Sequence, residues 1–273
     1  MRLKFCAFPF LALSVSLSQA ADLGDISSVL KSILAENDES RIPKLTEKLA
    51  TDGTADAIDS ATAEDIAGLL ISAKDCLLSQ KEKVRAGVLP LIFSIKMRPD
   101  SSSLLEPYID YLGTLLKQTD APVRAYVLII LGGTLPSPSP KTLSYLAAHV
   151  RDKNTAIADI SVAAAGLLNP NHPLDPSILK SILDVVHERS DPGLTNAILQ
   201  QMGLYQISHA EALKFVKASL NDVNPNIRRT AVEASGRMRR DVKWNFTSEL
   251  LRIASSSEET AETRSLAERA LRQ

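Results

Sequence analysis

Cysteine, glycine and aromatic residues are all scarce in this sequence. The 273 residues include 2 Cys, 11 Gly and 1 Trp, and only 4% are aromatic although 45% are hydrophobic. A β-sandwich of this size is normally richer in aromatic and β-branched residues and in glycine turns. A core built from Ala, Leu, Ile and Val instead favours closely packed helices, so the sequence predicts an all-α protein.

A strong net charge is also missing. The chain has 31 Lys and Arg against 32 Asp and Glu, a formal charge of −1. Nucleic-acid binding depends on a basic surface that neutralises phosphates, so this balance argues against a nucleic-acid partner. The sequence also has no GxSxG, phosphate loop, dinucleotide fingerprint or HExxH motif. We therefore expect no catalytic residue, no metal and no cofactor.

The first twenty residues have the features of a secretory signal peptide. Arg2 and Lys4 precede an apolar run, and Ser18-Gln19-Ala20 forms a small-x-Ala cleavage site. The apolar run is shorter than the roughly 20 residues that cross a bilayer, so we expect cleavage and no membrane insertion afterwards. The mature protein would begin at Ala21, in the periplasm or outside the cell. Its one cysteine, Cys76, has apolar neighbours and is expected to be buried and inert.

A segment of fixed pattern occurs four times without gaps. The copies start at Asp120, Asn154, Asp191 and Asn224, and successive starts are 34, 37 and 33 residues apart. Each opens with Asp or Asn, a good helix N-cap. The residue three positions after this Asp or Asn is apolar, and we call it the start residue. A glycine lies nine positions after the start residue. The start residues are Val123, Ile157, Leu194 and Ile227, and the glycines are Gly132, Gly166, Gly203 and Gly236.

The pattern indicates a helix that packs against copies of itself. Counted from the start residue, offsets 0, 4, 7 and 8 lie on one helical face, and the glycine lets a neighbouring backbone approach. We assign offset 5, also apolar, to packing between repeats: Leu89, Leu128, Val162, Leu199 and Val232. A weaker copy starts at Lys81 with Phe93 in the glycine position, and a frayed one lies near 263–271. A second amphipathic segment precedes every copy: 64–78, 104–118, 142–152, 177–189, 210–220 and 248–255.

Helix pairs at this spacing resemble HEAT repeats, whose second helix follows the pattern Asp/Asn-x-x-Val-Arg-x-x-Ala…Gly. The resemblance covers about residues 62–272, or six pairs, and implies an α-solenoid. We divide the chain into a signal peptide (1–20), an irregular N-terminal helical cap with a flexible joint at 51–61 (21–61), and a HEAT-like repeat domain (62–273). The proline-rich stretches 134–140 and 169–177 are interpreted as turns between repeats.

Three sets of polar or aromatic residues are weighed for a functional role. Arginine follows the start residue in four copies: Arg85, Arg124, Arg228 and Arg264. An anion-binding ladder is one interpretation, but recurrence in register with the repeat favours pairing with an acid or with carbonyls of the adjacent turn. His149 and His187 hold equivalent places in successive pairs and are candidates for neighbours, but no motif makes them metal ligands. Trp244 is expected to pack at the apolar end.

In HEAT-like solenoids the second helices line the concave face, and the resemblance implies that offsets 2 and 6 point outward. This outward column changes from apolar to charged along the chain: Ala86, Pro90, Ala125, Ile129, Asp159, Ala163, Asn196, Gln200, Arg229 and Glu233. We predict a graded groove in which Ile129 takes an apolar part of a partner and Arg229 orients a charged end. A basic cluster is the second candidate surface: Arg228, Arg229, Arg237, Arg239, Arg240 and Lys243.

The sequence thus favours an exported, non-enzymatic scaffold that binds a protein or peptide. The predicted partner-binding residues are Ile129, Asp159, Asn196, Gln200, Arg229, Glu233, Arg237 and Arg240. An enzyme or enzyme subunit is the first alternative, because phycobilin lyases and alkylpurine DNA glycosylases have a similar architecture. Those families work inside cells, and no motif of theirs beyond the repeat is found here. A structural part of an envelope assembly is the other alternative.

Overall fold

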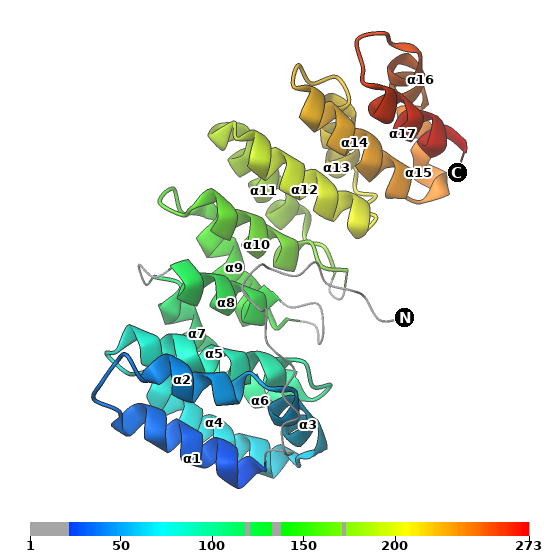
Figure 1. Ribbon diagram of the computed structural model, residues 1–273. Helices are drawn as coiled ribbons and strands as arrows, with labels where there is room; N and C mark the ends of the chain where they lie inside the picture. Colours follow the sequence, from blue (N-terminus) through cyan, green and yellow to red (C-terminus); the bar gives the residue numbers. More distant parts are fainter. Residues whose placement is uncertain (1–21, 118–120, 133–137, 171–172, 273) are drawn as a thin grey trace.

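A computed structural model describes residues 22–117, 121–132, 138–170 and 173–272 (Figure 1). All regular structure in these residues is helical. The helices stack in chain order into an elongated array, with α1 at one end and α17 at the other (Figure 1). The predicted all-α solenoid is confirmed. The predicted signal peptide lies outside the described residues.

Six helix pairs form the repeat domain, as the sequence predicted. The first helices are α4 (Ala63–Leu77), α7 (Ile109–Leu115), α9 (Pro140–Arg151), α11 (Pro176–Arg189), α13 (Ala210–Ser219) and α16 (Thr247–Ser255). The second helices are α5 (Glu82–Lys96), α8 (Ala121–Gly132), α10 (Ile157–Leu167), α12 (Pro192–Leu204), α14 (Pro225–Arg237) and α17 (Ala261–Arg272). Short elements precede two first helices: α6 (Ser101–Leu105) with η2 (Glu106–Tyr108), and α15 (Arg240–Lys243) with η3 (Trp244–Phe246). Each second helix packs against the next one, from α5 through to α17.

The N-terminal cap contains α1 (Leu23–Ala35), α2 (Ile42–Thr46), η1 (Glu47–Leu49) and α3 (Asp52–Ser60). The last of these corrects the flexible joint expected at 51–61. Thr51 caps α3 by accepting from the Thr54 backbone N–H at 3.2 Å, and Ile58 is fully buried. Arg98, just after α5, donates to the carbonyls of Ile58 and Ala61. This polar stretch is therefore a short helix that is buried on one side. The bonds from Arg98 attach it to the first repeat.

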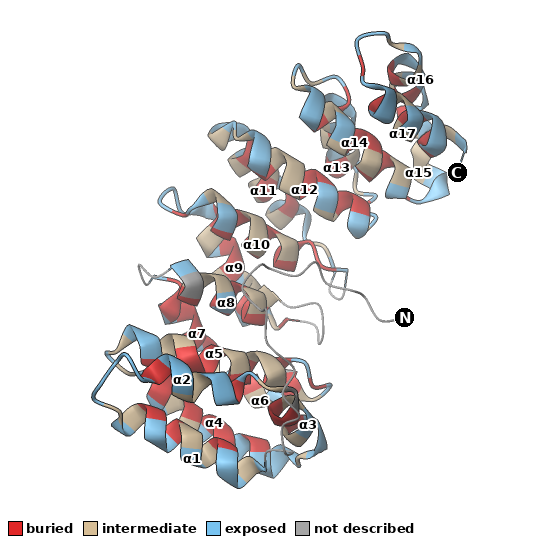
Figure 2. Cartoon of the chain, viewed as in Figure 1, coloured by how far each residue is buried: buried red, intermediate tan, exposed pale blue. Residues whose placement is uncertain are grey.

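The core runs between the helices along the whole array. On α8 the residues at offsets 0, 4, 7 and 8 are all buried, as are most residues of the offset-5 set. Val162 is the exception in that set, since it is only half-buried. Figure 2 shows the buried residues on the helix sides that face neighbouring helices. The packing roles that the sequence assigned to these positions are confirmed.

The repeat glycines allow second helices to approach closely. A Cβ on Gly166 would lie 2.5 Å from Gly132 Cα, and a Cβ on Gly203 would lie 2.7 Å from Ala234 Cα. Such distances leave no room for a methyl group between two backbones. At Gly166 and Gly203 the glycine at offset 9 therefore sets the spacing of neighbouring second helices, as the sequence indicated.

Helix starts agree with the sequence in two of three described copies. Asp191 caps α12 and Asn224 caps α14 through their side chains. The third expectation was wrong, because α10 begins at Ile157 with Ala156 as its N-cap and without a side-chain cap. Asn154 instead belongs to the preceding turn, where its backbone N–H donates to Asp152 Oδ1 at 2.9 Å. The cap expected at Asp120 lies outside the described residues.

Candidate functional site

The recurrent arginines bind the turns between paired helices. Carbonyls at the end of a helix lack intrahelical donors and lie at the negative end of the helix dipole, so a guanidinium there is stabilising. Three of the four arginines supply such bonds to carbonyls five to eight residues earlier: Arg85 to Ser79 and Gln80, Arg228 to Asp222 and Val223, and Arg264 to Ser256 and Glu259. The structural role that the register favoured is confirmed at these positions.

One turn takes its arginine from the next repeat. Ala158 stands where α10 would carry the recurrent arginine, and the turn before α10 is bound by Arg189 at the end of α11. The Arg189 guanidinium donates to the carbonyls of Asp152 and Lys153. Sequence reasoning missed this residue because Arg189 lies outside the repeated segment. The missing arginine at position 158 was the available signal.

Arg124 uses its guanidinium to join two repeats. Its Nε lies 2.8 Å from Asp159 Oδ2 on α10, and the two side chains are only 16% and 7% exposed. Asp159 was expected to point outward and bind a partner, and Ala163, one turn on, was also placed in the outward column. Both are buried. The close approach of α8 and α10 at their glycines explains the correction, because it brings this face of α10 against α8.

A cleft of about 560 Å³ opens beside this ion pair. It lies where the ends of α7 and α9 meet the starts of α8 and α10. Its volume falls within the range of small-ligand sites in proteins. The polar side chains that line it include Lys117, Arg124, Tyr145, His149, Asp152 and Asp159.

His149 is the lining residue with an unmet hydrogen-bonding capacity. Its Nε2 is buried and has no hydrogen-bond partner among the described residues. Burial lowers the pKa of His149; the charge of Arg124 acts in the same direction, while Asp159 and Asp152 oppose it. The imidazole is therefore neutral at pH 7. His187 is exposed on α11 and does not line the cleft.

The other predicted partner-binding residues are spread along the second-helix face. Ile129 on α8 is half-buried, and Gln200 on α12 is exposed. Asn196 is half-buried, and its Oδ1 is buried without a hydrogen-bond partner in the described part of the chain. Arg229 on α14 is exposed and forms two ion pairs. Its Nε lies 3.4 Å from Glu233 Oε1, and its Nη2 lies 2.9 Å from Glu262 Oε1. These residues lie on α8, α12 and α14, with the corresponding α10 positions buried, and they do not converge on one pocket.

The basic cluster divides into paired and unpaired arginines. Arg228 pairs with Glu259 at 2.5 Å, and Arg239 with Asp241 at 3.0 Å. Arg237 and Arg240 are exposed, and neither has a hydrogen-bond or ion-pair partner among the residues that the structure describes. Trp244, expected to be a packing residue, is 72% exposed. Phe246 takes the buried position two residues later, which explains why the expectation for Trp244 was wrong.

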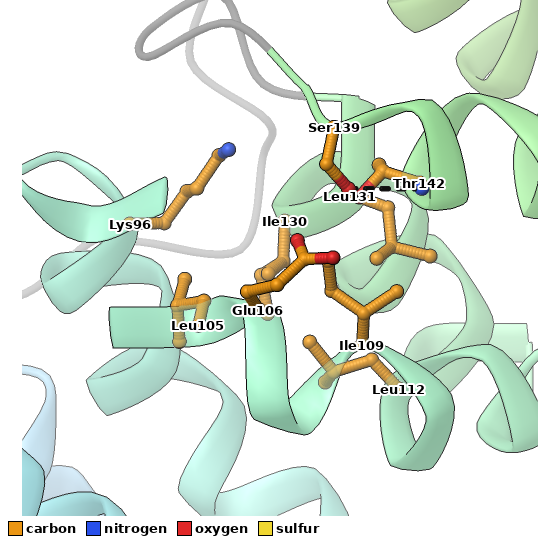
Figure 3. A pocket seen from close by; sticks show the side chains of 9 residues that line it. All are labelled: Lys96, Leu105, Glu106, Ile109, Leu112, Ile130, Leu131, Ser139 and Thr142. Carbon is orange, nitrogen blue, oxygen red and sulfur yellow. Dashed lines mark hydrogen bonds between the residues drawn. The ribbon is translucent and has the colours of Figure 1, made fainter. Parts of the chain in front are cut away.

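A second hollow lies between α5, α6, η2, α7, α8 and the start of α9 (Figure 3). Its volume is about 20 Å³, enough for little more than one water molecule. Aliphatic side chains such as Leu105 and Ile130 make up most of its wall, with Lys96, Glu106, Ser139 and Thr142 beside them. Burial lowers the pKa of the Lys96 amine. The hollow is too small to hold a substrate.

The described residues contain neither a cluster of metal-binding side chains nor a membrane-spanning helix. No group of three or more His, Cys, Asp or Glu side chains lies close enough together there to hold a metal ion. Among the same residues, no helix has both the length and the apolar character needed to span a membrane.

No protein-family model and no curated protein matches the sequence. Solved structures with a similar arrangement include a designed armadillo repeat protein in complex with the peptide (KR)4, with 14% identity, coverage of 91% of this chain and 98% of that chain, and a TM-score of 0.44. An archaeal HEAT-like repeat protein from Thermococcus onnurineus has 14% identity, 91% coverage of each chain and a TM-score of 0.37. Human deoxyhypusine hydroxylase has 14% identity, coverage of 92% and 96%, and a TM-score of 0.38. At these values, no function passes from them to this chain.

Proposed function

We propose that this chain is an exported, non-enzymatic scaffold that holds a protein or peptide along its second-helix face. The observation that carries the proposal is a set of accessible side chains on three of the second helices, α8, α12 and α14. It starts with Tyr126, 37% exposed, and Ile129 on α8, continues with Gln200 on α12, and ends with Arg229 and Glu233 on α14. A surface that changes from apolar to amide to charged suits an extended partner with one apolar and one charged end.

The Arg124–Asp159 pair limits where the partner lies. Asp159 already accepts from Arg124 and is buried, so it holds two repeats together and does not contact the partner. The cleft next to this pair, with Lys117 and Tyr145 on its wall, provides a recess for one partner side chain. The proposed contact residues are therefore Ile129, Asn196, Gln200, Arg229 and Glu233.

Export belongs to the proposal because of the N-terminal sequence. Arg2 and Lys4, the apolar run and the Ser18-Gln19-Ala20 site support cleavage by a signal peptidase. N-terminal sequencing of protein from the cells that make it should begin at Ala21. A sequence that begins at Met1 would count against export.

The binding test uses two charge-introducing variants with matched controls. A partner is first captured with the mature protein from its own envelope or secreted fraction and purified, and its affinity is then measured by calorimetry. Ile129→Asp and Arg229→Glu should each weaken binding about tenfold or more, since each removes a proposed anchor. Ala218→Asp and Lys214→Glu make the same kinds of change on exposed positions of α13, a first helix, and should bind like the parent. Helicity is checked in all four. If Ile129→Asp and Arg229→Glu fold and bind like the parent, the second-helix face is not the binding surface.

A further inference from the structure

Among the described residues, the first helices and the short elements before them expose large apolar side chains only in the first and last pairs. On the first pair these are Ile71, 64% exposed, and Leu78, 50% exposed. On the last pair they are Trp244, 72% exposed, and Leu251, 55% exposed. Among the described residues, none of the exposed large apolar side chains lies on α7, α9, α11 or α13. The outer surfaces of those central helices are polar, with ion pairs such as Lys141–Asp110 and Lys180–Asp184.

Each pair of apolar residues belongs to an exposed stripe. Ile71 and Leu78 are seven residues apart in sequence, and so are Trp244 and Leu251. This spacing places side chains on one side of a helix. We call these rows the α4 stripe, Glu64, Gly68, Ile71, Asp75 and Leu78, and the α16 stripe, Arg240, Trp244, Ser248, Leu251 and Ser255. All ten residues are exposed. A Cβ added to Gly68 would meet no atom within 4 Å, so the α4 stripe is open at its centre.

Both stripes lie on firmly packed helices. Thr62 and Asp65 form a capping box at the start of α4, and Ile66 and Leu70 on its opposite side are fully buried. Phe246 is fully buried beside Trp244, and the Asn245 side chain donates to the Val242 carbonyl at 2.7 Å. The exposure of Ile71 and Trp244 is therefore a property of the folded surface. Exposed Trp is costly to keep in water, and Trp and Arg are the residues that dominate binding at protein interfaces.

The segments beside the two stripes carry opposite charge. Between residues 22 and 65, eleven acidic residues stand against four basic ones, and Glu64 and Asp75 lie within the α4 stripe itself. Between residues 237 and 244, four basic residues stand against one acidic residue. Arg237 and Arg240 are the exposed arginines there that lack a partner in the described chain. Each stripe thus has the apolar content of the other and the opposite charge.

We propose that the α16 stripe of one copy docks on the α4 stripe of a second copy. The contact covers Trp244 and Leu251 with Ile71 and Leu78, and places Arg240 against an acidic surface. The two stripes are different surfaces, so the contact is heterologous and leaves each copy with one unused stripe. Repetition of such a contact gives a ring or an open chain of solenoids.

The test compares assembly by the parent chain from Ala21 with assembly by two variants, each blocked at one end. Masses are measured by sedimentation velocity across a concentration series. The parent should grow beyond one copy as its concentration rises. Ile71→Asp on the α4 stripe and Trp244→Asp on the α16 stripe should each weaken association about tenfold or more. Both positions are exposed, so both variants should keep the parent's helicity. Leu204→Asp changes a residue that is 54% exposed on neither stripe and should assemble like the parent.

Mixing the two variants gives the decisive result. Each variant keeps one intact stripe, so an equimolar mixture of Ile71→Asp and Trp244→Asp should form one-to-one dimers at a concentration at which each variant alone is monomeric. A parent that stays monomeric at all concentrations, variants that assemble like the parent, or a mixture that stays monomeric would each overturn the proposal. Binding of the monomeric parent to acidic peptides or to anionic vesicles, lost in Trp244→Asp, would assign the α16 stripe to another partner and would also overturn it.

Discussion

At the scale of single residues, the spacing of the repeats depends on glycines that face backbone. Gly203 on α12 is the clearest case, since its missing Cβ would lie 2.7 Å from the Ala234 backbone. Gly203→Ala should lower the free energy of unfolding by about 1–3 kcal/mol, because the two helices must move apart to admit the methyl group. Chemical denaturation measures the change.

Gly68→Ala is the matched control for that prediction. It also lies within a helix, but a Cβ there meets open space, so the same substitution should raise the free energy of unfolding by about 0.5–1 kcal/mol through helix propensity alone. Equal effects at positions 68 and 203 would mean that close helix approach does not determine the cost.

His149 gives the stability of the protein a specific dependence on pH. Burial lowers its pKa in the folded state, and the charged groups that face it are Asp159, Arg124 and Asp152. Below the unfolded pKa of about 6.5, the unfolded chain binds the proton more readily than the folded one does. The free energy of unfolding therefore carries no cost from His149 above that pH. It decreases as the pH falls from about 6.5 towards the lower pKa of His149 in the folded state.

His149→Gln should remove this contribution. The free energy of unfolding of the variant should fall less between pH 7 and pH 5 than that of the parent, as followed by urea denaturation at each pH. His187→Gln alters an exposed histidine on α11 and should keep the parent's dependence. The account of His149 is wrong if the two variants respond to pH in the same way.

Several residue roles followed from the sequence because they repeat. The register of Arg85, Arg228 and Arg264 was enough to predict their bonds to turn carbonyls. Asp159 and Trp244 were misplaced because both depend on a single contact. The first is buried by the local approach of α8 to α10, and the second is exposed because Phe246 fills the adjacent space. No periodicity records such one-off contacts.

At the scale of helices, α10 differs from its neighbours in its first turn. The starts of α9, α11, α12 and α14 are capped by Ser139, Asp175, Asp191 and Asn224, whereas Ala156 supplies no side-chain cap to α10. Ala156 has extended backbone angles, φ −64° and ψ 146°, which suit a capping residue. Ala156→Ser should therefore raise the free energy of unfolding by about 0.5–1 kcal/mol, which is detected as a higher midpoint of thermal unfolding.

Asp191→Ala provides the comparison in the opposite direction. It removes the bond from the Leu194 backbone N–H to Asp191 Oδ1, 2.8 Å long, and should destabilise by about 1 kcal/mol. If Ala156→Ser leaves the midpoint unchanged while Asp191→Ala lowers it, the first turn of α10 is satisfied by another group.

The helices of the repeat domain could be predicted from the sequence, whereas α3, which precedes the domain, could not. The spacing and the apolar face recur in four clear copies and two weaker ones, so each copy supports the assignment of the others. The stretch 51–61 has no copies and is rich in Asp, Ala and Thr, a composition shared by loops and short helices. Its helical state depends on burial of Ile58 and on the carbonyl bonds from Arg98, a residue 40 positions away.

At the scale of the whole molecule, the first and last helices of the array are polar on their outward sides. The outward side of α17 carries Glu262, Ser265, Glu268 and Arg269, all exposed, and that of α1 carries Asp25, Ser28, Lys31 and Ser32. Such caps prevent continuous stacking of repeats between copies. The proposed contact between copies therefore uses the sides of α4 and α16 rather than the ends of the stack.

Small-angle X-ray scattering of the chain from Ala21 tests the solenoid most directly. Dilute samples of Ile71→Asp avoid the proposed association between copies. A compact domain of this length has a radius of gyration of about 18 Å. The stacked helix pairs predict a radius of gyration well above that value and a pair-distance distribution with a tail towards long distances. A radius of gyration near 18 Å with a symmetric distribution would contradict the elongated array, and with it the extended second-helix face on which the proposed function depends.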